Sequence, residues 1–384
     1  MDGPILPEQI MNEERAGMQD RVSLKEKFFG CIAGAHVGAA LGAPVQGRSW
    51  QEIEEEFGVL DKLMPYERSW ARAAGTTESG IERQKLLITA ICERQDRVTA
   101  EDVRAIWNAD LCRGSAEKVM EPFDIGLLAV ANSGIPARDL GKYCDYAGQS
   151  NFAGFCHPVG LINAGDVKNA IRDAFELGQL YQASGSYGVK WSGVTAAAIA
   201  AATKPDATID SVIHDLFTHC QYADVGARID GYKYGYLRDN VPEELEKGLK
   251  LTAGCQDFRE LRQAFDRIYH GCGVPYGSSF ANEVVTKAIC IVKMVDANVH
   301  DAIIAGANMG RDTVGVTALA AGISGAIRGS AALPKSFVAQ VDYATNLNKY
   351  TCSKKTIAAQ AESLYQAFQS RLLSINSLVA EMIV

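Results

Sequence analysis

The sequence lacks several features that would assign a function class directly. Its 384 residues carry a formal net charge of −8, which makes nucleic acid and anionic membrane surfaces poor candidate partners. We identify no charge-free apolar run of about 18 residues or more, and therefore expect no membrane-spanning segment. The N-terminal stretch MDGPILPEQIMNEERAG lacks the positive start and the apolar stretch of a secretory signal.

Paired cysteine motifs are also lacking. The ten cysteines are scattered and form no CxxC motif, which argues against a zinc site or a disulfide framework. Several lie inside apolar helical patterns, where a free cysteine behaves as a small hydrophobic residue. We therefore expect a reducing, cytoplasmic compartment.

The alternation of apolar and polar residues that marks strands is absent, whereas helical periodicity runs through most of the chain. The spacing predicts helices at residues 23–44, 81–95, 99–111, 166–182, 193–203, 208–220, 258–269, 283–295, 301–309, 316–329 and 354–383. The loops between them are short and marked by Gly and Pro. We predict an all-α protein with one domain over residues 23–384 and a flexible N-terminal arm over residues 1–22.

Three stretches combine polar side chains with small residues at expected helix ends. They are Thr76–Ser79 in GTTESGIERQ, Arg311–Thr313 in NMGRDTVG, and GFCHPVGLINAGD, which holds His157, Asn163 and Asp166. Each polar residue can serve simply as a helix cap, and His157 as a hydrogen-bonded interior histidine. Carboxylates and hydroxyls at two helix starts are also what an oxygen-seeking cation requires. The free N–H groups of the same ends would instead attract an anionic or polar ligand.

The order of these motifs resembles the ADP-ribosylglycohydrolase family, which includes dinitrogen-reductase-activating glycohydrolases and J1 crystallins. The resemblance covers residues 24–340 and is carried by GAALGAPVQ, TESG, PVGLINAGD and GRDTVGVTALAAGISGAIRG. It implies a compact single-domain bundle of orthogonal helices. It also implies a central cleft with one or two magnesium ions, where the family cleaves the glycosidic bond of a ribosyl group.

Carried over residue by residue, the resemblance implies a depleted set of magnesium ligands. Thr77, Glu78 and Asp312 are the ligands that a retained ion would use. The other ligand positions of the family are occupied by Ala39, Gln46, Ser79, Val314 and Gly315. Two carboxylates and one hydroxyl supply too little negative charge for two divalent ions. We therefore expect no cofactor, with one weakly held magnesium ion as the alternative.

The sequence favours a repurposed enzyme whose inherited cleft works without a metal cluster. Glu78 and Asp312 would act as an acid–base pair, with His157 as the third catalytic candidate. This chemistry suits hydrolysis, elimination or cyclisation of a small molecule, which we expect to be ribosyl- or nucleotide-like. Expected substrate contacts are Thr77, Ser79, Asn163, Asp166, Trp191, Tyr276, Arg311 and Thr313. Phe155, Trp191 and Tyr276 would form an aromatic wall, although all three are also typical of plain core.

Two other functions remain open at this point. The first is a magnesium-dependent ADP-ribosyl glycohydrolase with a weakened metal site, which would lose activity in chelator. The second is non-catalytic, either a binder of an ADP-ribose-like nucleotide or a structural protein of the crystallin type. Stabilisation by a ligand without turnover would identify a binder. The segment Cys272–Phe280 is either a loop over the cleft or a plain connection.

Overall fold

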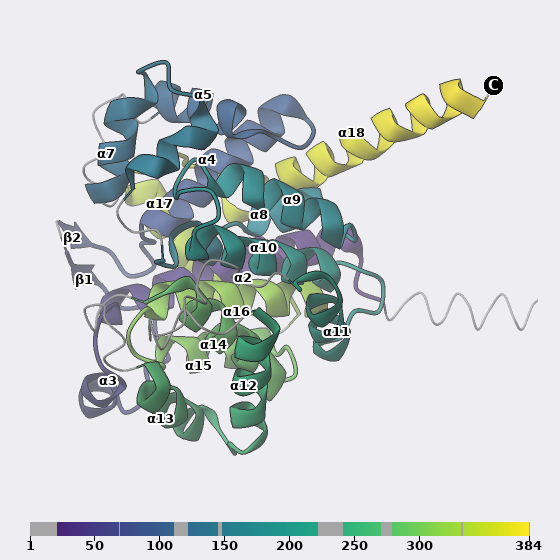
Figure 1. Ribbon diagram of the computed structural model, residues 1–384. Coiled ribbons are helices and arrows are strands. Elements are labelled where there is room, and N and C mark those ends of the chain that lie inside the picture. Colours follow the sequence, from purple (N-terminus) through teal and green to yellow (C-terminus); the bar gives the residue numbers. More distant parts are fainter. Residues whose placement is uncertain are drawn as a thin grey trace, which may run out of the picture.

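Two helices rich in Gly and Ala form the centre of the protein. The structure is a computed structural model that describes residues 21–68, 70–110, 122–144, 148–221, 241–269, 279–331 and 333–383. Within it, α2 (Leu24–Gly42) and α16 (Thr313–Arg328) pack against each other along their length (Figure 1). The proposed arm at residues 1–22 lies almost entirely outside the described residues.

Close packing of α2 against α16 depends on glycine at every fourth residue of α2. These residues are Gly30, Gly34, Gly38 and Gly42. A Cβ atom at any of them would lie within 2.3–2.6 Å of a backbone atom of α16, so a larger residue would force the helices apart. Because Gly42 faces Thr313, this packing places the end of α2 beside the start of α16.

The remaining elements surround this pair, and α10, α14, α15 and α18 lie closest to it. The α-helices are α3 (Trp50–Phe57), α4 (Ser79–Arg94), α5 (Ala100–Asp110), α7 (Pro122–Ala131), α8 (His157–Ile162), α9 (Val167–Gly178), α10 (Tyr187–Ala202), α11 (Ile209–His219), α12 (Val241–Ala253), α13 (Phe258–Tyr269), α14 (Ala281–Met294), α15 (Val299–Ala307), α17 (Lys335–Leu347) and α18 (Ile357–Ile383). Short 3₁₀ helices are η1 (Ala43–Val45), η3 (Ala137–Tyr143) and η4 (Asn151–Gly154). One antiparallel ribbon pairs β1 (Tyr66–Glu67) with β2 (Ala71–Arg72).

The all-α, single-domain prediction is confirmed, and the differences have local causes. The strands of the ribbon contain two residues each, which is too short to produce an alternating pattern. Helix α10 begins six residues before the predicted position 193, because the side chain of Ser186 accepts a hydrogen bond from the N–H of Val189 and caps the helix there. Helices α3, α7, α8, α12 and α17 were not predicted.

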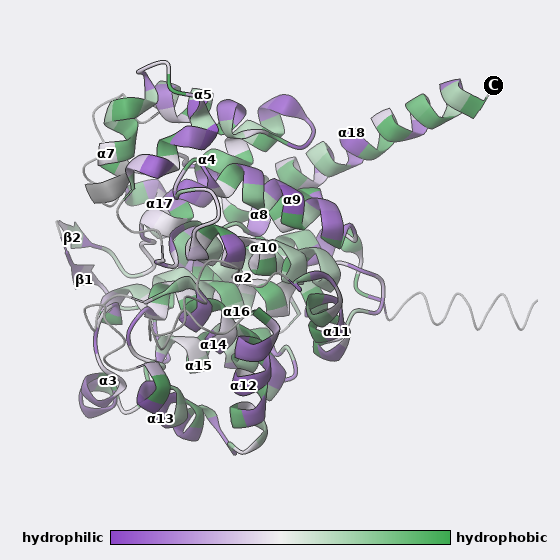
Figure 2. Ribbon diagram, viewed as in Figure 1, coloured by the Kyte–Doolittle hydropathy of each residue, from purple (hydrophilic) through white to green (hydrophobic). Residues whose placement is uncertain are grey.

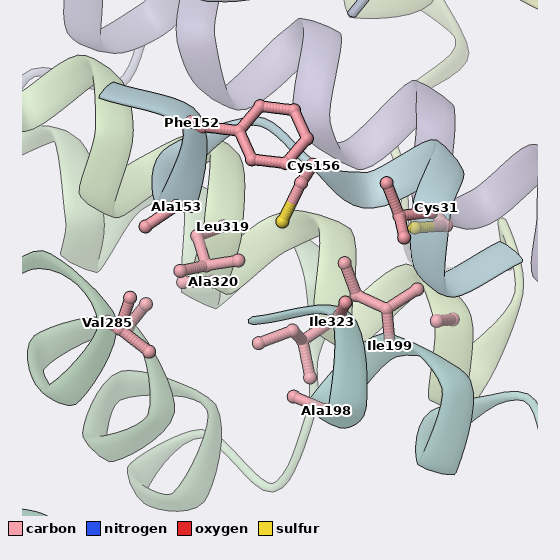
Figure 3. Packing of buried hydrophobic residues seen from close by; sticks show 14 of the residues in the cluster. Cys31, Phe152, Ala153, Cys156, Ala198, Ile199, Val285, Leu319, Ala320 and Ile323 are labelled. Carbon is pink, nitrogen blue, oxygen red and sulfur yellow. The ribbon is translucent and has the colours of Figure 1, made fainter. Parts of the chain in front are cut away.

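Buried apolar side chains from distant parts of the chain meet in one core. Figure 3 shows Phe152 of η4, Ile199 of α10, Val285 of α14 and Ile323 of α16 in this cluster. Outer helices such as α3 are largely hydrophilic in colour (Figure 2).

The sequence does contain one long apolar segment, which the search for charge-free apolar runs missed. The segment Leu24–Val45 is long and apolar enough to cross a membrane by length and composition. However, 89% of its most apolar window is buried inside the protein, as in the central helix of a helical domain. The sequence pattern missed it because glycine and alanine dilute the apolar signal of larger side chains.

Candidate active site at the start of two helices

The first turns of α4 and α16 lie at one pocket, although they are far apart in the chain. The pocket has a volume of about 150 Å³. Glu78 and Ser79 line it at the start of α4, and Asp312 and Val314 line it at the start of α16. The two carboxylates therefore share one pocket. The other walls come from Gln46, Arg68, Gly80, Arg83, Gln149, Ser150, Asn151, Phe155 and Ser279.

One side of the pocket is apolar. Phe155 and Val314 line it and belong, with Ala39 and Ile81, to a small buried cluster that is separate from the main core. The ring of Phe155 lies directly against Gly80, where a Cβ atom would approach to 2.1 Å. Glycine at this position therefore lets the ring cover the first turn of α4.

Glu78 is neutralised by groups from the β1–β2 ribbon. The hydroxyl of Tyr66 donates to its Oε1 at 2.7 Å, and Nη1 of Arg72 lies 2.8 Å from the same oxygen. Nη1 of Arg68 lies 3.3 Å from Oε2. Burial and the negative charge of Glu78 raise the pKa of Tyr66, so the phenol stays protonated and remains a donor. Although Glu78 precedes α4, its side chain does not cap the helix.

Asp312 is held by neutral donors. Its Oδ1 accepts the N–H of Gly315 at 2.9 Å and Nε2 of Gln46 at 3.2 Å, and its Oδ2 accepts the hydroxyl of Ser150 at 2.7 Å. It thereby caps α16. Among the described residues, no lysine or arginine forms an ion pair with it. Asp312 therefore brings to the pocket a carboxylate that is held by neutral hydrogen-bond donors.

Gln46 bridges Asp312 and the backbone of α16. Its Nε2 donates to Asp312, while its Oε1 accepts the N–H of Val314 at 2.9 Å. The hydroxyl of Thr313 donates to the carbonyl of Gly42 at 2.8 Å and does not line the pocket. Thr313, expected to bind substrate, instead joins α16 to the end of α2.

Arg311 also points away from the pocket. Its Nε and Nη2 lie 2.7 and 3.0 Å from the two carboxylate oxygens of Glu283, and Lys287 binds Glu283 at 2.7 Å. Burial opposes the ionisation of Glu283, but the charges of Lys287 and Arg311 outweigh it and lower the pKa of this carboxyl. Arg311 has a φ of 62°, so this pairing holds a strained residue next to Asp312.

His157 lies in the interior and does not line the pocket. Its Nδ1 accepts from the amide of Gln84 at 3.0 Å, so its Nε2 carries the proton and donates to the carbonyl of Ala318 at 3.2 Å. The Oε1 of Gln84 lies 3.1 Å from Nε2 of His36. Burial lowers the pKa of His157 to about 4, and burial with the charge of Lys85 lowers that of His36 to about 3. This network joins α2, α4, α8 and α16.

The other sequence candidates lie elsewhere. Asn163 bonds Asp173 at 2.8 Å, Asp166 caps α9 through the N–H of Asn169, and Trp191 is buried in α10. Thr77 is buried but does not line the pocket. Tyr276 and most of the segment Cys272–Phe280 lie outside the described residues.

Several pocket residues were missed by the sequence reasoning. Asn151 and Ser279 are 5% and 3% exposed, and neither has a side-chain hydrogen-bond partner within the described part of the chain. Buried polar side chains normally have partners, so both groups point to a polar ligand. The Gly/Ser/Asn-rich stretch GQSN, which contains Asn151, was the one available signal.

Comparison with known proteins identifies the family of this chain. The model of the ADP-ribosylglycohydrolase family matches residues 20–372. The chain belongs to the ADP-ribosylglycohydrolase family. A solved structure described as an "ADP-ribosylglycohydrolase-related protein complex" is similar over 90% of this chain and 99% of that chain, with a TM-score of 0.59 and 15% identity. At this identity the likeness shows the fold alone. No curated protein matches the chain.

Magnesium is implied by the ADP-ribosylglycohydrolase family, but the donor atoms of this pocket do not fit it. The guanidinium of Arg72 already lies beside the Glu78 carboxylate, which leaves Asp312 as the one pocket carboxylate without a cationic partner among the described residues. Val314 and Ala39, at two family ligand positions, belong to the apolar cluster. In the described residues, no group of three or more His, Cys, Asp or Glu side chains is placed to hold an ion.

Proposed function

We propose that this family member is a hydrolase of a small ribosyl- or nucleotide-like molecule that works without a metal cluster. The observation that carries the proposal is the state of Asp312, a pocket carboxylate whose charge is held only by neutral donors among the described residues. Such a carboxylate can accept a proton or stabilise developing positive charge.

Asp312 would act as the general base. In glycoside hydrolysis, the transition state has oxocarbenium character and carries positive charge at the anomeric carbon. As the glycosidic bond breaks, a water molecule would bond to that carbon through its oxygen and lose a proton to Asp312. The leaving group would take up a proton from solvent, and Asp312 would return its own proton to solvent. The same base would serve an elimination or a cyclisation, but family membership favours hydrolysis.

Other residues that line the pocket would recognise the rest of the substrate. Arg68 and Arg83 bring positive charge to the pocket, which suits a phosphate or carboxylate group. Asn151 and Ser279 offer an amide and a hydroxyl to substrate hydroxyls. A cavity of about 150 Å³ holds one small ring, so a nucleotide would bind with one ring inside and extend outward.

Glu78 has a different part in this proposal from the one expected from the sequence. Because Arg72 and Tyr66 bind its Oε1, the carboxylate would orient the arginines and would not exchange protons with substrate. The acid–base pair of the sequence prediction thus becomes one base, Asp312, and one positioning residue, Glu78.

Release of ADP-ribose from ADP-ribosylated peptides and from small ADP-ribosyl adducts tests this proposal. We expect the same rate in excess EDTA and in added magnesium, and loss of activity in Asp312→Asn. A matched control is Asp166→Asn, which changes the cap of α9 away from the pocket. Activity that disappears in EDTA and returns with magnesium would establish the magnesium-dependent alternative.

A non-catalytic binder is the second candidate, favoured by one observation. The buried side chains of Asn151 and Ser279 are expected to bind a polar ligand, whether or not the protein cleaves a bond in that ligand. If ADP-ribose raises the melting temperature of the wild-type protein while every adduct remains intact, binding without turnover is the function.

A further inference from the structure

The hydroxyl of Ser150 does not serve its own helix. Ser150 holds the N-cap position of η4, where a serine side chain commonly caps the backbone, but it makes no capping hydrogen bond. Instead it donates to Oδ2 of Asp312 at 2.7 Å, across 162 residues of sequence. Both residues line the pocket. Ser150 therefore connects the segment before η4 to the carboxylate at the start of α16.

The two oxygens of Asp312 differ in what the protein already supplies to them. Oδ1 accepts two hydrogen bonds, from the N–H of Gly315 at 2.9 Å and from Nε2 of Gln46 at 3.2 Å. A carboxylate oxygen has two lone pairs, so these donors fill Oδ1. Within the described part of the chain, Oδ2 has one donor, the hydroxyl of Ser150. Oδ2 is therefore the oxygen that can accept a further donor, such as a water molecule or a substrate hydroxyl.

The position of Ser150 is fixed by its backbone. Its N–H donates to the carbonyl of Ser279 at 3.2 Å, and the N–H of Ala281 donates to the carbonyl of Gly148 at 3.0 Å. These bonds join the segment before η4 to the start of α14. Because its main chain is held in this way, Ser150 can keep the carboxylate of Asp312 in a set direction.

Ser279 provides a comparison within the same pair of segments. It also lines the pocket and is 3% exposed, but its hydroxyl has no partner among the described residues. The two serines share a residue type and a location, and they differ in what their hydroxyls bind. The hydroxyl of Ser279 is available to a ligand, whereas that of Ser150 is engaged by Asp312.

We propose that Ser150 is a positioning residue for Asp312. Its hydroxyl holds the plane of the carboxylate, so that the remaining lone pair of Oδ2 stays aligned with the proton that this oxygen accepts. The proposal rests on the proposed function, in which Asp312 is the general base. A misplacement of about 1 Å at a reacting group can cost about 100-fold in rate, so one hydroxyl at this place can matter to catalysis.

Steady-state kinetics on an ADP-ribosyl adduct that the wild type hydrolyses test this role. Ser150→Ala should lower kcat by about 10- to 100-fold and change KM less than about threefold, because it disturbs the base and leaves the substrate contacts intact. Ser150→Thr retains the hydroxyl and should keep kcat within about threefold of the wild type. Ser279→Ala should instead raise KM about tenfold with kcat within about threefold, because its hydroxyl contacts the substrate.

Crystal structures of the wild type and of Ser150→Ala test the position of the carboxylate without any turnover. We expect Oδ2 of Asp312 to move by about 1 Å in the variant, while Oδ1 stays bound to Gly315 and Gln46. Ser150→Thr should return Oδ2 to its wild-type position. An unmoved carboxylate in Ser150→Ala would overturn the positioning role, whatever the reaction proves to be.

The same variants separate this inference from the proposed function. If Asp312→Asn is inactive and Ser150→Ala keeps the wild-type kcat, Asp312 is the base and the positioning role is wrong. If Ser150→Thr loses as much kcat as Ser150→Ala, the hydroxyl is not the group that matters, and the role is also wrong. If Asp312→Asn keeps the wild-type activity, the proposed base is wrong, and Ser150 then positions no catalytic group.

Discussion

The starts of α4 and α16 look alike in sequence and differ in chemistry. Each has a carboxylate just before its helix, and both carboxylates line the same pocket. Glu78 is bound by Arg72, Arg68 and Tyr66 and leaves its helix uncapped. Asp312 caps its helix and is bound by an amide, a hydroxyl and a backbone N–H.

This difference separates two uses of a carboxylate at one site. A charge that the protein already neutralises contributes to structure, because removing it leaves a buried cation alone. A charge held by neutral donors remains available to a substrate. We therefore expect substitution of Glu78 to lower mainly the stability, and substitution of Asp312 to lower mainly the activity.

The largest expected effect is on catalysis, at Asp312. Asp312→Asn keeps the size of the side chain and a good helix cap, so stability should change little. Loss of the base should lower kcat by about 10²–10⁴-fold with a small change in KM. Steady-state kinetics with a turned-over ADP-ribosyl substrate measure this. Equal activity in Asp312→Asn and wild type would remove Asp312 from the mechanism.

Glu78→Gln should act mainly on stability. It leaves the guanidinium of Arg72 buried without its counter-charge, which we expect to lower the free energy of unfolding by about 3–5 kcal/mol. Urea denaturation measures the change. Exposed Glu67 on the same ribbon gives a matched control, since Glu67→Gln should stay within about 0.5 kcal/mol. If Glu78→Gln is as stable as Glu67→Gln, Glu78 does not serve as the structural counter-charge of Arg72, and its contrast with Asp312 does not hold.

The buried His36 and His157 should make the free energy of unfolding sensitive to acid. His157 and His36 have folded-state pKa values of about 4 and about 3, below the ordinary value of 6.5. Below pH 6.5 the unfolded chain binds protons that the folded protein does not. Stability should therefore fall with pH, by about 2 kcal/mol per histidine at pH 5.

Unfolding free energies measured between pH 7.5 and pH 5 test this slope. The double variant His36→Gln, His157→Gln should show a shallower slope than wild type. The control variant is His214→Gln, which removes an exposed histidine outside this buried network. A wild-type protein as stable at pH 5 as at pH 7 would mean that these imidazoles are not buried as neutral groups.

The shared pocket followed from local sequence pattern, because polar side chains at two expected helix starts predicted a common site. The partners of Glu78 could not be predicted, because Arg72 and Tyr66 come from two-residue strands that leave no pattern. His157 was assigned to the site because its interior partner, Gln84, lies in another helix. Side-chain pairing of this kind is set by tertiary structure alone.

The smallest expected effect tests whether the pocket has lost the ability to bind a cation. Gln46→Glu replaces the amide that donates to Asp312 with a carboxylate about the same size. The new oxygen can still accept the N–H of Val314, but it faces Asp312 as a like charge. We expect a loss of about 1–2 kcal/mol in the free energy of unfolding.

Magnesium should then distinguish this variant from the wild type. Two adjacent carboxylates attract a divalent ion, so millimolar magnesium chloride should raise the melting temperature of Gln46→Glu more than potassium chloride of equal ionic strength. The wild type should respond equally to both salts, because its amide satisfies Asp312 without an ion. Gln46→Met, which removes the donor without adding charge, should not gain the magnesium response. A specific magnesium response in the wild type would mean that the start of α16 still binds a cation, and Asp312 would then act as a ligand instead of a base.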